Sequence, residues 1–174
     1  MERLMSRTLI LLRHGKSDWS TDDNDFNRPI KKRGKNASRL AGEWLSAHKR
    51  IPDFVITSPA KRAMQTAEIA CEAMGITKNN IYSRKHIYLA TTEELLYVLE
   101  DCPEQAQCVM MVGHNPGLEE LLYYLVNGTM TIPEDGKIMP TAALAILEMP
   151  DNWTQLQSVS ARLEFLIRPR DLSE

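Results

Sequence analysis

Three short segments of the chain hold side chains that could act together on a phosphoryl group. They are Arg13-His14, the stretch from Ser58 to Arg62, and Gly113-His114, and they lie far apart in the sequence. An arginine guanidinium is a planar, permanently charged fork of donors that matches the oxygens of a phosphate. An unprotonated imidazole is a competent covalent nucleophile near neutral pH. Two arginines and two histidines could therefore bind a phosphate without a metal and transfer it.

The spacing of these residues does not decide which histidine attacks, and each residue also has a simpler interpretation. An isolated histidine is more often structural than catalytic. Ser58 could be a hydrolase nucleophile, but no Gly-x-Ser-x-Gly elbow surrounds it, and a helix cap before Pro59 is a sufficient role. A metal site would recruit His14, His114 and carboxylates, yet no compact ligand motif such as His-Glu-x-x-His is present.

Short apolar runs place the three segments at the ends of predicted strands. Thr8 to Leu12, Phe54 to Thr57 and Cys108 to Val112 are typical of strands buried on both faces. Each run ends directly before one of the three segments. Because ligands of parallel α/β sheets bind at the carboxyl ends of the strands, we expect the three segments to meet at one rim of the sheet.

Helical patterns and further strands complete the predicted fold. Apolar spacing and capping residues predict helices that begin near Ala37 with Gly34 at its approach, after Ser58-Pro59, at the Thr91 to Glu94 capping box, and near Leu118. Further strands are predicted at residues 81–82, 142–147 and 155–161, with a loop over residues 127–141. This alternation predicts one domain over residues 1–174, a three-layer α/β/α sandwich with a mostly parallel central sheet.

Composition and charge narrow the range of partners and compartments. The formal net charge of -2 provides no global attraction to nucleic acid or to anionic lipid. Three cysteines form neither a disulfide framework nor a zinc pattern, and the first apolar run, Leu9 to Leu12, is too short for a membrane span. We expect a cytoplasmic protein that binds neither nucleic acid nor membrane, while its oligomeric state stays open.

The motifs carry a resemblance to a known enzyme family. The segment from Leu12 to Ser17 resembles the signature of the histidine phosphatase superfamily, in which the histidine after the arginine is phosphorylated. Ser58 to Ala67 is similar to the family's second arginine motif, and Gly113 to Pro116 to its second histidine motif. The segment from Asp25 to Ile30, followed by Arg33-Gly34, most resembles the small SixA-type phosphohistidine phosphatases. Three ordered motifs make a far more specific signal than one tripeptide.

The resemblance implies a phosphoglycerate mutase-like fold, no required cofactor or metal, and a phosphohistidine intermediate on His14. Its catalytic set would be His14, Arg13, Arg62, His114 and Asp25, with substrate contacts from Arg13, Ser17, Arg28, Ser58, Arg62 and His114. The substrate would be a phosphohistidine-bearing protein or a compact phosphorylated molecule. A small-molecule phosphomonoesterase and a non-catalytic phosphate-binding module are the alternatives, and turnover of a simple phosphoester would exclude the binding module.

The general acid and the substrate-recognition residues are less well determined by these motifs. The resemblance points to Asp25 as the acid, with Glu93 or Glu94 as alternatives, although Asp25 lies in a polar stretch that also fits a solvated loop. A basic run formed by Lys31, Lys32, Arg33 and Lys35 could steer phosphorylated substrates or simply begin a solvated helix. Substrate choice is expected to depend on the loops at residues 16–30 and 127–141.

Overall fold

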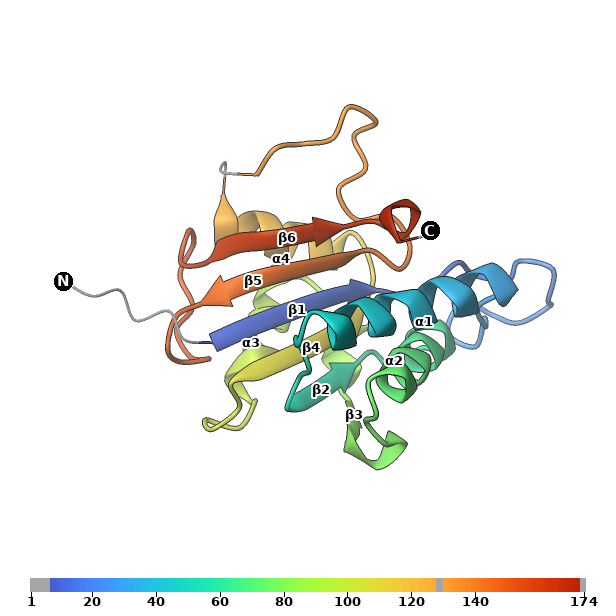
Figure 1. Ribbon diagram of the computed structural model, residues 1–174, viewed down its shortest axis with the longest axis horizontal. Coiled ribbons are helices and arrows are strands. Elements are labelled where there is room, and N and C mark those ends of the chain that lie inside the picture. Colours follow the sequence, from blue (N-terminus) through green and yellow to red (C-terminus); the bar gives the residue numbers. More distant parts are fainter. Residues whose placement is uncertain (1–6, 128–129, 173–174) are drawn as a thin grey trace.

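A six-stranded sheet in the order β3-β2-β4-β1-β5-β6 forms the centre of the computed structural model, which describes residues 7–127 and 130–172 (Figure 1). The strands are β1 (Arg7–Arg13), β2 (Phe54–Thr57), β3 (Ile81–Ser83), β4 (Cys108–Gly113), β5 (Leu144–Met149) and β6 (Arg162–Ile167). Strands β1 to β4 pair in parallel, whereas β5 runs antiparallel to both β1 and β6. The prediction of a mostly parallel sheet is confirmed.

Four helices cover the two faces of this sheet. They are α1 (Lys32–Ala47), α2 (Lys61–Ala73), α3 (Thr92–Glu100) and α4 (Gly117–Val126). Alternate residues of β1 point to opposite faces, so Ile10 and Leu12 join the core beneath α1 and α2, while Leu9 and Leu11 join the core with α3 and α4. The three-layer α/β/α sandwich is therefore confirmed, and β1 is buried on both sides.

Helix α1 begins at Lys32, five residues earlier than the sequence predicts. Gly34 lies inside its first turn rather than ahead of it. A Cβ atom on Gly34 would lie 2.6 Å from both the nitrogen and the oxygen of Lys16. The start of α1 thus packs backbone to backbone on the loop after β1, a contact for which only glycine is small enough. Apolar periodicity did not reveal this turn because the contact involves no apolar side chain.

The predicted strand at residues 155–161 is wrong. Gln155 and Val159 have φ angles of 54° and 56°, which a continuous strand does not accept, and the last strand is instead β6. The Val159 side chain is also exposed. Residues 162–167 form the strand that follows β5 because they pair with β5 in antiparallel orientation. The register of this pairing shifts between Ile146 and Leu147.

The segments around the sheet mostly follow the predictions. The capping box at Thr91 and Glu94 is present at the start of α3. Residues 130–141 of the predicted loop form neither helix nor strand, and its residues 128 and 129 lie outside the described ranges.

Within residues 7–127 and 130–172, no helix has both the length and the apolar character needed to cross a membrane.

Candidate active site

The carboxyl ends of β1, β2 and β4 meet at one rim of the sheet and bring the three predicted segments together. They surround a cavity of about 290 Å³, here called the catalytic cavity. It is lined by Arg13, His14, Lys16, Ser17, Trp19, Asp25, Arg28, Arg62, His114, Asn115 and Thr141. Of the predicted site residues, Ser58 alone is not part of the lining, and the alternatives Glu93 and Glu94 are also absent from it.

His14 is buried at the end of β1 with its ring held in one orientation. Its Nδ1 atom lies 2.8 Å from the carbonyl oxygen of Gly15. A carbonyl oxygen can only accept, so the proton of the neutral ring is on Nδ1 and the Nε2 atom keeps its lone pair. Burial lowers the His14 pKa to about 4, and the nearby Arg62 and Arg13 act in the same direction. At neutral pH His14 is therefore an unprotonated imidazole.

The loop that carries His14 is fixed on several sides. The His14 amide donates to the Gly113 carbonyl oxygen of β4 at 3.1 Å. The Gly15 amide donates to the Thr66 hydroxyl at 2.9 Å, and this hydroxyl donates to the Arg62 carbonyl oxygen at 2.8 Å. The same threonine of α2 therefore links the histidine loop to the turn of α2 that carries Arg62. These bonds set the position of the imidazole before any ligand binds.

Two arginines give the catalytic cavity its positive charge. Arg13 donates to the Met139 carbonyl oxygen at 3.0 Å, and Arg62 donates to the backbone oxygen and the carboxylate of Asp25 at 2.5 and 3.2 Å. The Arg13 pKa is lowered, first by burial and also by the like charge of Arg62, while Glu119 opposes this shift. The two positive charges repel each other, and an anion bound between the two guanidinium groups would relieve this repulsion.

His114 extends from the end of β4 and lies beside His14. The centroids of the two rings are 5.2 Å apart, and the Nε2 atom of His114 lies 2.7 Å from the Ser58 hydroxyl oxygen. Burial lowers the His114 pKa to about 3, with smaller contributions from His14 and Arg62. Its Nδ1 atom is buried and finds no hydrogen-bond partner within the described part of the chain.

Ser58 supports His114 and does not cap α2 as predicted. Helix α2 begins at Lys61 with Ala60 as its N-cap, so Pro59 precedes the helix instead of occupying its first turn. The Ser58 hydroxyl accepts from the Ala60 amide at 3.2 Å and is fully buried behind His114. The sequence motif placed this serine correctly near the site, but its hydroxyl is directed at the histidine ring.

Asp25 reaches the catalytic cavity from the loop that follows β1. Its carboxylate accepts hydrogen bonds from Tyr88 at 2.5 Å, Arg28 at 3.1 Å and Arg62 at 3.2 Å. The hydrogen bond from Tyr88, followed by the two guanidinium groups, holds the Asp25 pKa below its usual value. Asp25 is therefore more than a residue of a solvated loop, because three hydrogen-bond donors hold its ionised carboxylate at the catalytic cavity. The aspartate is half-exposed, so solvent still reaches it.

Tyr88 is a site residue that the sequence analysis missed. Besides its bond to Asp25, its ring packs edge-on against His114 and Phe26, with centroid distances of 5.6 and 5.2 Å. No motif signals this tyrosine, because it follows the short turn Lys85–Ile87 rather than a strand end. Glu94, by contrast, uses its carboxylate in the capping box of α3 and in an ion pair with His86 at 3.7 Å.

Arg28 and Ser17 shape the outer wall of the catalytic cavity. The Arg28 guanidinium lies over the exposed ring of Trp19, 3.6 Å from its centroid, and the same arginine holds Asp25. Ser17 forms a backbone bridge with Ile30, which closes the loop that carries Asp25. These contacts explain how a polar loop without helix or strand can present an aspartate and an arginine at the cavity.

Comparisons with known proteins agree with this geometry. The family model described as histidine phosphatase superfamily (branch 1) matches residues 9–84, which include Arg13, His14 and Arg62. The solved structure named putative phosphohistidine phosphatase SixA from Agrobacterium tumefaciens is 26% identical, with a TM-score of 0.78 over 92% of this chain and 97% of that chain. Residues 9–84 thus match the histidine phosphatase superfamily, and the chain shares the fold of the SixA structure.

The similarity of this chain to SixA structures extends over nearly its whole length. A second structure of that name, from Nakamurella multipartitia, is 27% identical with a TM-score of 0.78, and the match covers 92% of this chain and 94% of that chain. An uncharacterised protein of Mycobacterium tuberculosis is 28% identical over 163 residues, which cover 91% of this chain and 100% of that protein. These likenesses support the SixA-type branch of the superfamily.

Proposed function

We propose that this protein removes phosphoryl groups by transferring them first to the Nε2 atom of His14 and then to water. The observation that carries the proposal is the hydrogen bond between His14 Nδ1 and the Gly15 carbonyl oxygen, because it leaves Nε2 unprotonated in a cavity lined by two arginines. A nucleophile and its anion-binding groups are thus already in place.

In the first step, Nε2 of His14 forms a bond to phosphorus while the bond from phosphorus to the leaving group breaks. Charge spreads over the equatorial oxygens, where the Arg13 and Arg62 guanidinium groups donate hydrogen bonds. The proton on Nδ1 keeps its hydrogen bond to the Gly15 carbonyl oxygen. This hydrogen bond stabilises the cationic phosphoimidazole that forms. In the second step, water attacks the same phosphorus and His14 leaves as a neutral ring.

We assign proton transfer to Asp25, assisted by Tyr88. In the free enzyme the carboxylate is ionised, because Tyr88 and two arginines stabilise its negative charge. A bound phosphate dianion would engage Arg62 and bring negative charge near Asp25, and both changes would raise the carboxyl pKa. Asp25 would then be able to carry a proton to the leaving group, and its ionised form would later accept one from the attacking water.

The preferred substrate in this proposal is phosphohistidine on a protein. Similarity to two structures named putative phosphohistidine phosphatase SixA supports this choice. The chemistry is also suitable, since an imidazole protonated on its second nitrogen is a good leaving group. The proposal includes a single domain over residues 1–174 that acts in the cytoplasm, on a phosphorylated protein or a compact phosphorylated molecule.

Rapid quench with radiolabelled phosphohistidine protein tests the mechanism. We expect acid-labile label on the peptide that contains His14, and none in His14→Asn, whose shorter amide can keep the donor to Gly15. His48→Asn is the matched control, because His48 is exposed but also bonds a carbonyl oxygen through Nδ1. Label on Ser58, or on His114 alone, would contradict the proposal. Phosphate binding without label or turnover would indicate a binding module, and a preference for small esters would favour a phosphomonoesterase.

A further inference from the structure

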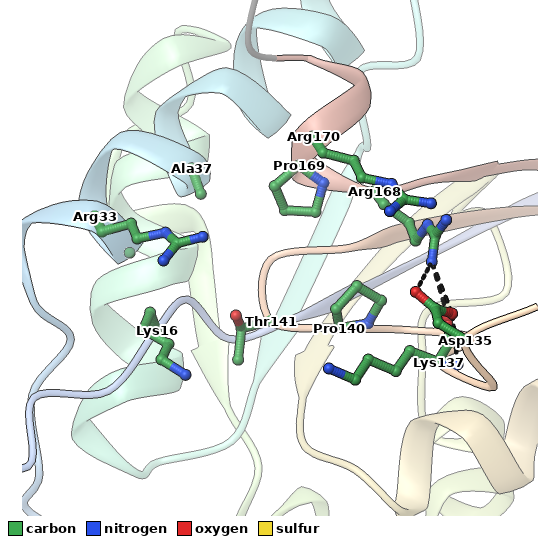
Figure 2. A pocket seen from close by; sticks show the side chains of 11 residues that line it. Lys16, Arg33, Ala37, Asp135, Lys137, Pro140, Thr141, Arg168, Pro169 and Arg170 are labelled. Carbon is green, nitrogen blue, oxygen red and sulfur yellow. Dashed lines mark hydrogen bonds and ion pairs between the residues drawn. The ribbon is translucent and has the colours of Figure 1, made fainter.

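A second cavity of about 290 Å³ opens beside the catalytic cavity (Figure 2). Lys16 and Thr141 line both cavities, which therefore meet at these two residues. The walls of the second cavity come from the loop after β1, the first turns of α1, the loop before β5 and the turn after β6. We call it the basic cavity because of the side chains described next.

Five cationic side chains and one carboxylate line the basic cavity, namely Lys16, Arg33, Lys137, Arg168, Arg170 and Asp135. The carboxylate is already engaged, because Asp135 accepts from Arg168 at 3.0 and 3.2 Å. Arg168 is mostly buried and thereby fixed, and it also donates to the Lys137 carbonyl oxygen at 3.4 Å. Asp135 and Arg168 thus form a neutral pair that shapes the wall of the cavity.

Three of the cations that line the basic cavity form no salt bridge with any described residue, although the Lys137 charge lies near Asp135 and helps to lower the pKa of its carboxylate. Among the described residues, the Lys16 and Lys137 ammonium groups and the Arg33 guanidinium have no ion-pair or side-chain hydrogen-bond partner. Figure 2 shows the Lys16 and Lys137 side chains directed toward one another below Thr141, and the Arg33 guanidinium above Thr141. The whole chain has a formal net charge of -2, so this positive charge is a local concentration and not a general property.

We infer that the basic cavity binds a second anionic group of the substrate whose phosphoryl group occupies the catalytic cavity. Like charges gathered at one concave site repel each other, and an anion placed among them relieves that repulsion. Lys16 is shared by both cavities and would contact both anionic groups. The inference rests on the proposed function and names its substrate class, a phosphorylated molecule with a second anionic group close to the phosphoryl group.

The second group could be supplied in two chemical forms. A lysine ammonium group acts as a point charge and can bind either a carboxylate or a phosphoryl group. A guanidinium group, by contrast, favours anions whose oxygens fit its two parallel N–H donors. An acidic side chain beside a phosphohistidine would supply a carboxylate. A small bisphosphorylated molecule would supply a second phosphoryl group. The experiment therefore compares both forms with substrates that lack the second anion.

The test measures kcat/KM for two matched substrate pairs. The first pair is a phosphohistidine peptide with aspartate or with asparagine beside the phosphohistidine, and the second is an alkanediol bisphosphate or the corresponding monophosphate. We expect the wild type to prefer the member with two anions in at least one pair. Arg33→Gln/Lys137→Gln should lower that preference about tenfold, as expected for the loss of two exposed charge contacts.

A second double variant provides the matched control. Arg39→Gln/Lys78→Gln removes the same two charge types from exposed positions away from both cavities, where each cation pairs with a carboxylate. It should keep the wild-type preference. Preference for the aspartate peptide identifies a protein source, and preference for the bisphosphate identifies a small molecule. A wild type without preference in either pair, or a folded Arg33→Gln/Lys137→Gln variant that keeps it, would overturn the inference.

A binding measurement separates this inference from the proposed function. In His14→Asn, which should not turn over, we expect inorganic phosphate at millimolar concentration to shift the NMR signals of the Arg33 guanidinium. In a His14→Asn chain that also carries Arg39→Gln/Lys78→Gln, the same shift should appear. If phosphate shifts the Arg33 signals in His14→Asn but rapid quench finds no phosphorylated His14 in the wild type, the proposed mechanism is rejected. The basic cavity is then retained as an anion site. Absence of the shift would reject the cavity as an anion site, whatever the result for His14.

Discussion

Acidification from pH 7 to pH 5 should destabilise the protein in a way that depends on His14. Burial lowers the pKa of folded His14 to about 4, whereas an unfolded histidine titrates near its ordinary value of 6.5. Between these two values the unfolded chain binds a proton at this residue and the folded chain does not. The free energy of unfolding therefore falls as the pH drops through 6.5, and the loss is complete only below about pH 4.

The size of this loss follows from proton linkage. At pH 5 an unfolded histidine is almost fully protonated while folded His14 is mostly neutral. The difference amounts to about 2 kcal/mol between pH 7 and pH 5 for this single residue. With a urea dependence of about 2 kcal/mol per molar for a domain of this size, the urea midpoint should fall by about 1 M from His14 alone.

Urea titrations at pH 7 and pH 5 on the wild type, His14→Asn and His48→Asn would measure this contribution. His14→Asn should lose about 2 kcal/mol less than the wild type over this interval, because asparagine does not titrate. His48→Asn is the control for a histidine-to-asparagine substitution at an exposed position outside the catalytic cavity. An equal loss in His14→Asn and wild type would refute the conclusion that His14 is held neutral by burial.

Three further predictions concern catalysis. Arg62→Ala should lower kcat/KM for p-nitrophenyl phosphate by a factor on the order of 100, about 3 kcal/mol of transition-state stabilisation, and wild-type turnover in the folded variant would place the phosphate elsewhere. Asp25→Asn should slow hydrolysis of alkyl phosphates much more than that of p-nitrophenyl phosphate, because an alkoxide needs a proton. An equal loss would make Asp25 a positioning residue. Chelators should leave activity intact while vanadate inhibits it, and recovery of chelated enzyme by zinc or magnesium would indicate a metal mechanism.

The sequence predicted the parts of the site that follow directly from strand ends. Arg13 and His14 end β1, and His114 follows β4, so their meeting needed only parallel strands and short loops. The strands β1, β2 and β4 were recognisable because parallel strands buried on both faces are continuous apolar runs. The start of α1 was not, since its first turn is held by the glycine contact with Lys16 and by no apolar side chain.

The roles of individual side chains at the site depended on contacts between distant segments. Ser58 has the residue type of a helix cap, but its hydroxyl is directed at His114 once β2 and β4 are neighbours. Tyr88 carries no motif and became a site residue because the turn before α3 brings it to Asp25. Sequence spacing cannot predict such contacts, because they depend on the rotations and separations of packed elements.

The amino-acid sequence by itself determined the layered α/β architecture, the rim that holds the site, and the grouping of two histidines with two arginines. These features follow from local patterns: apolar runs, strand ends and short motifs. Only the tertiary structure decided the tautomer of His14, the ionised state of Asp25 and the basic cavity beside the catalytic one. Each of these depends on burial or on charges brought together from separate loops, because the pKa of a group and the field in a cavity are set by neighbours in space.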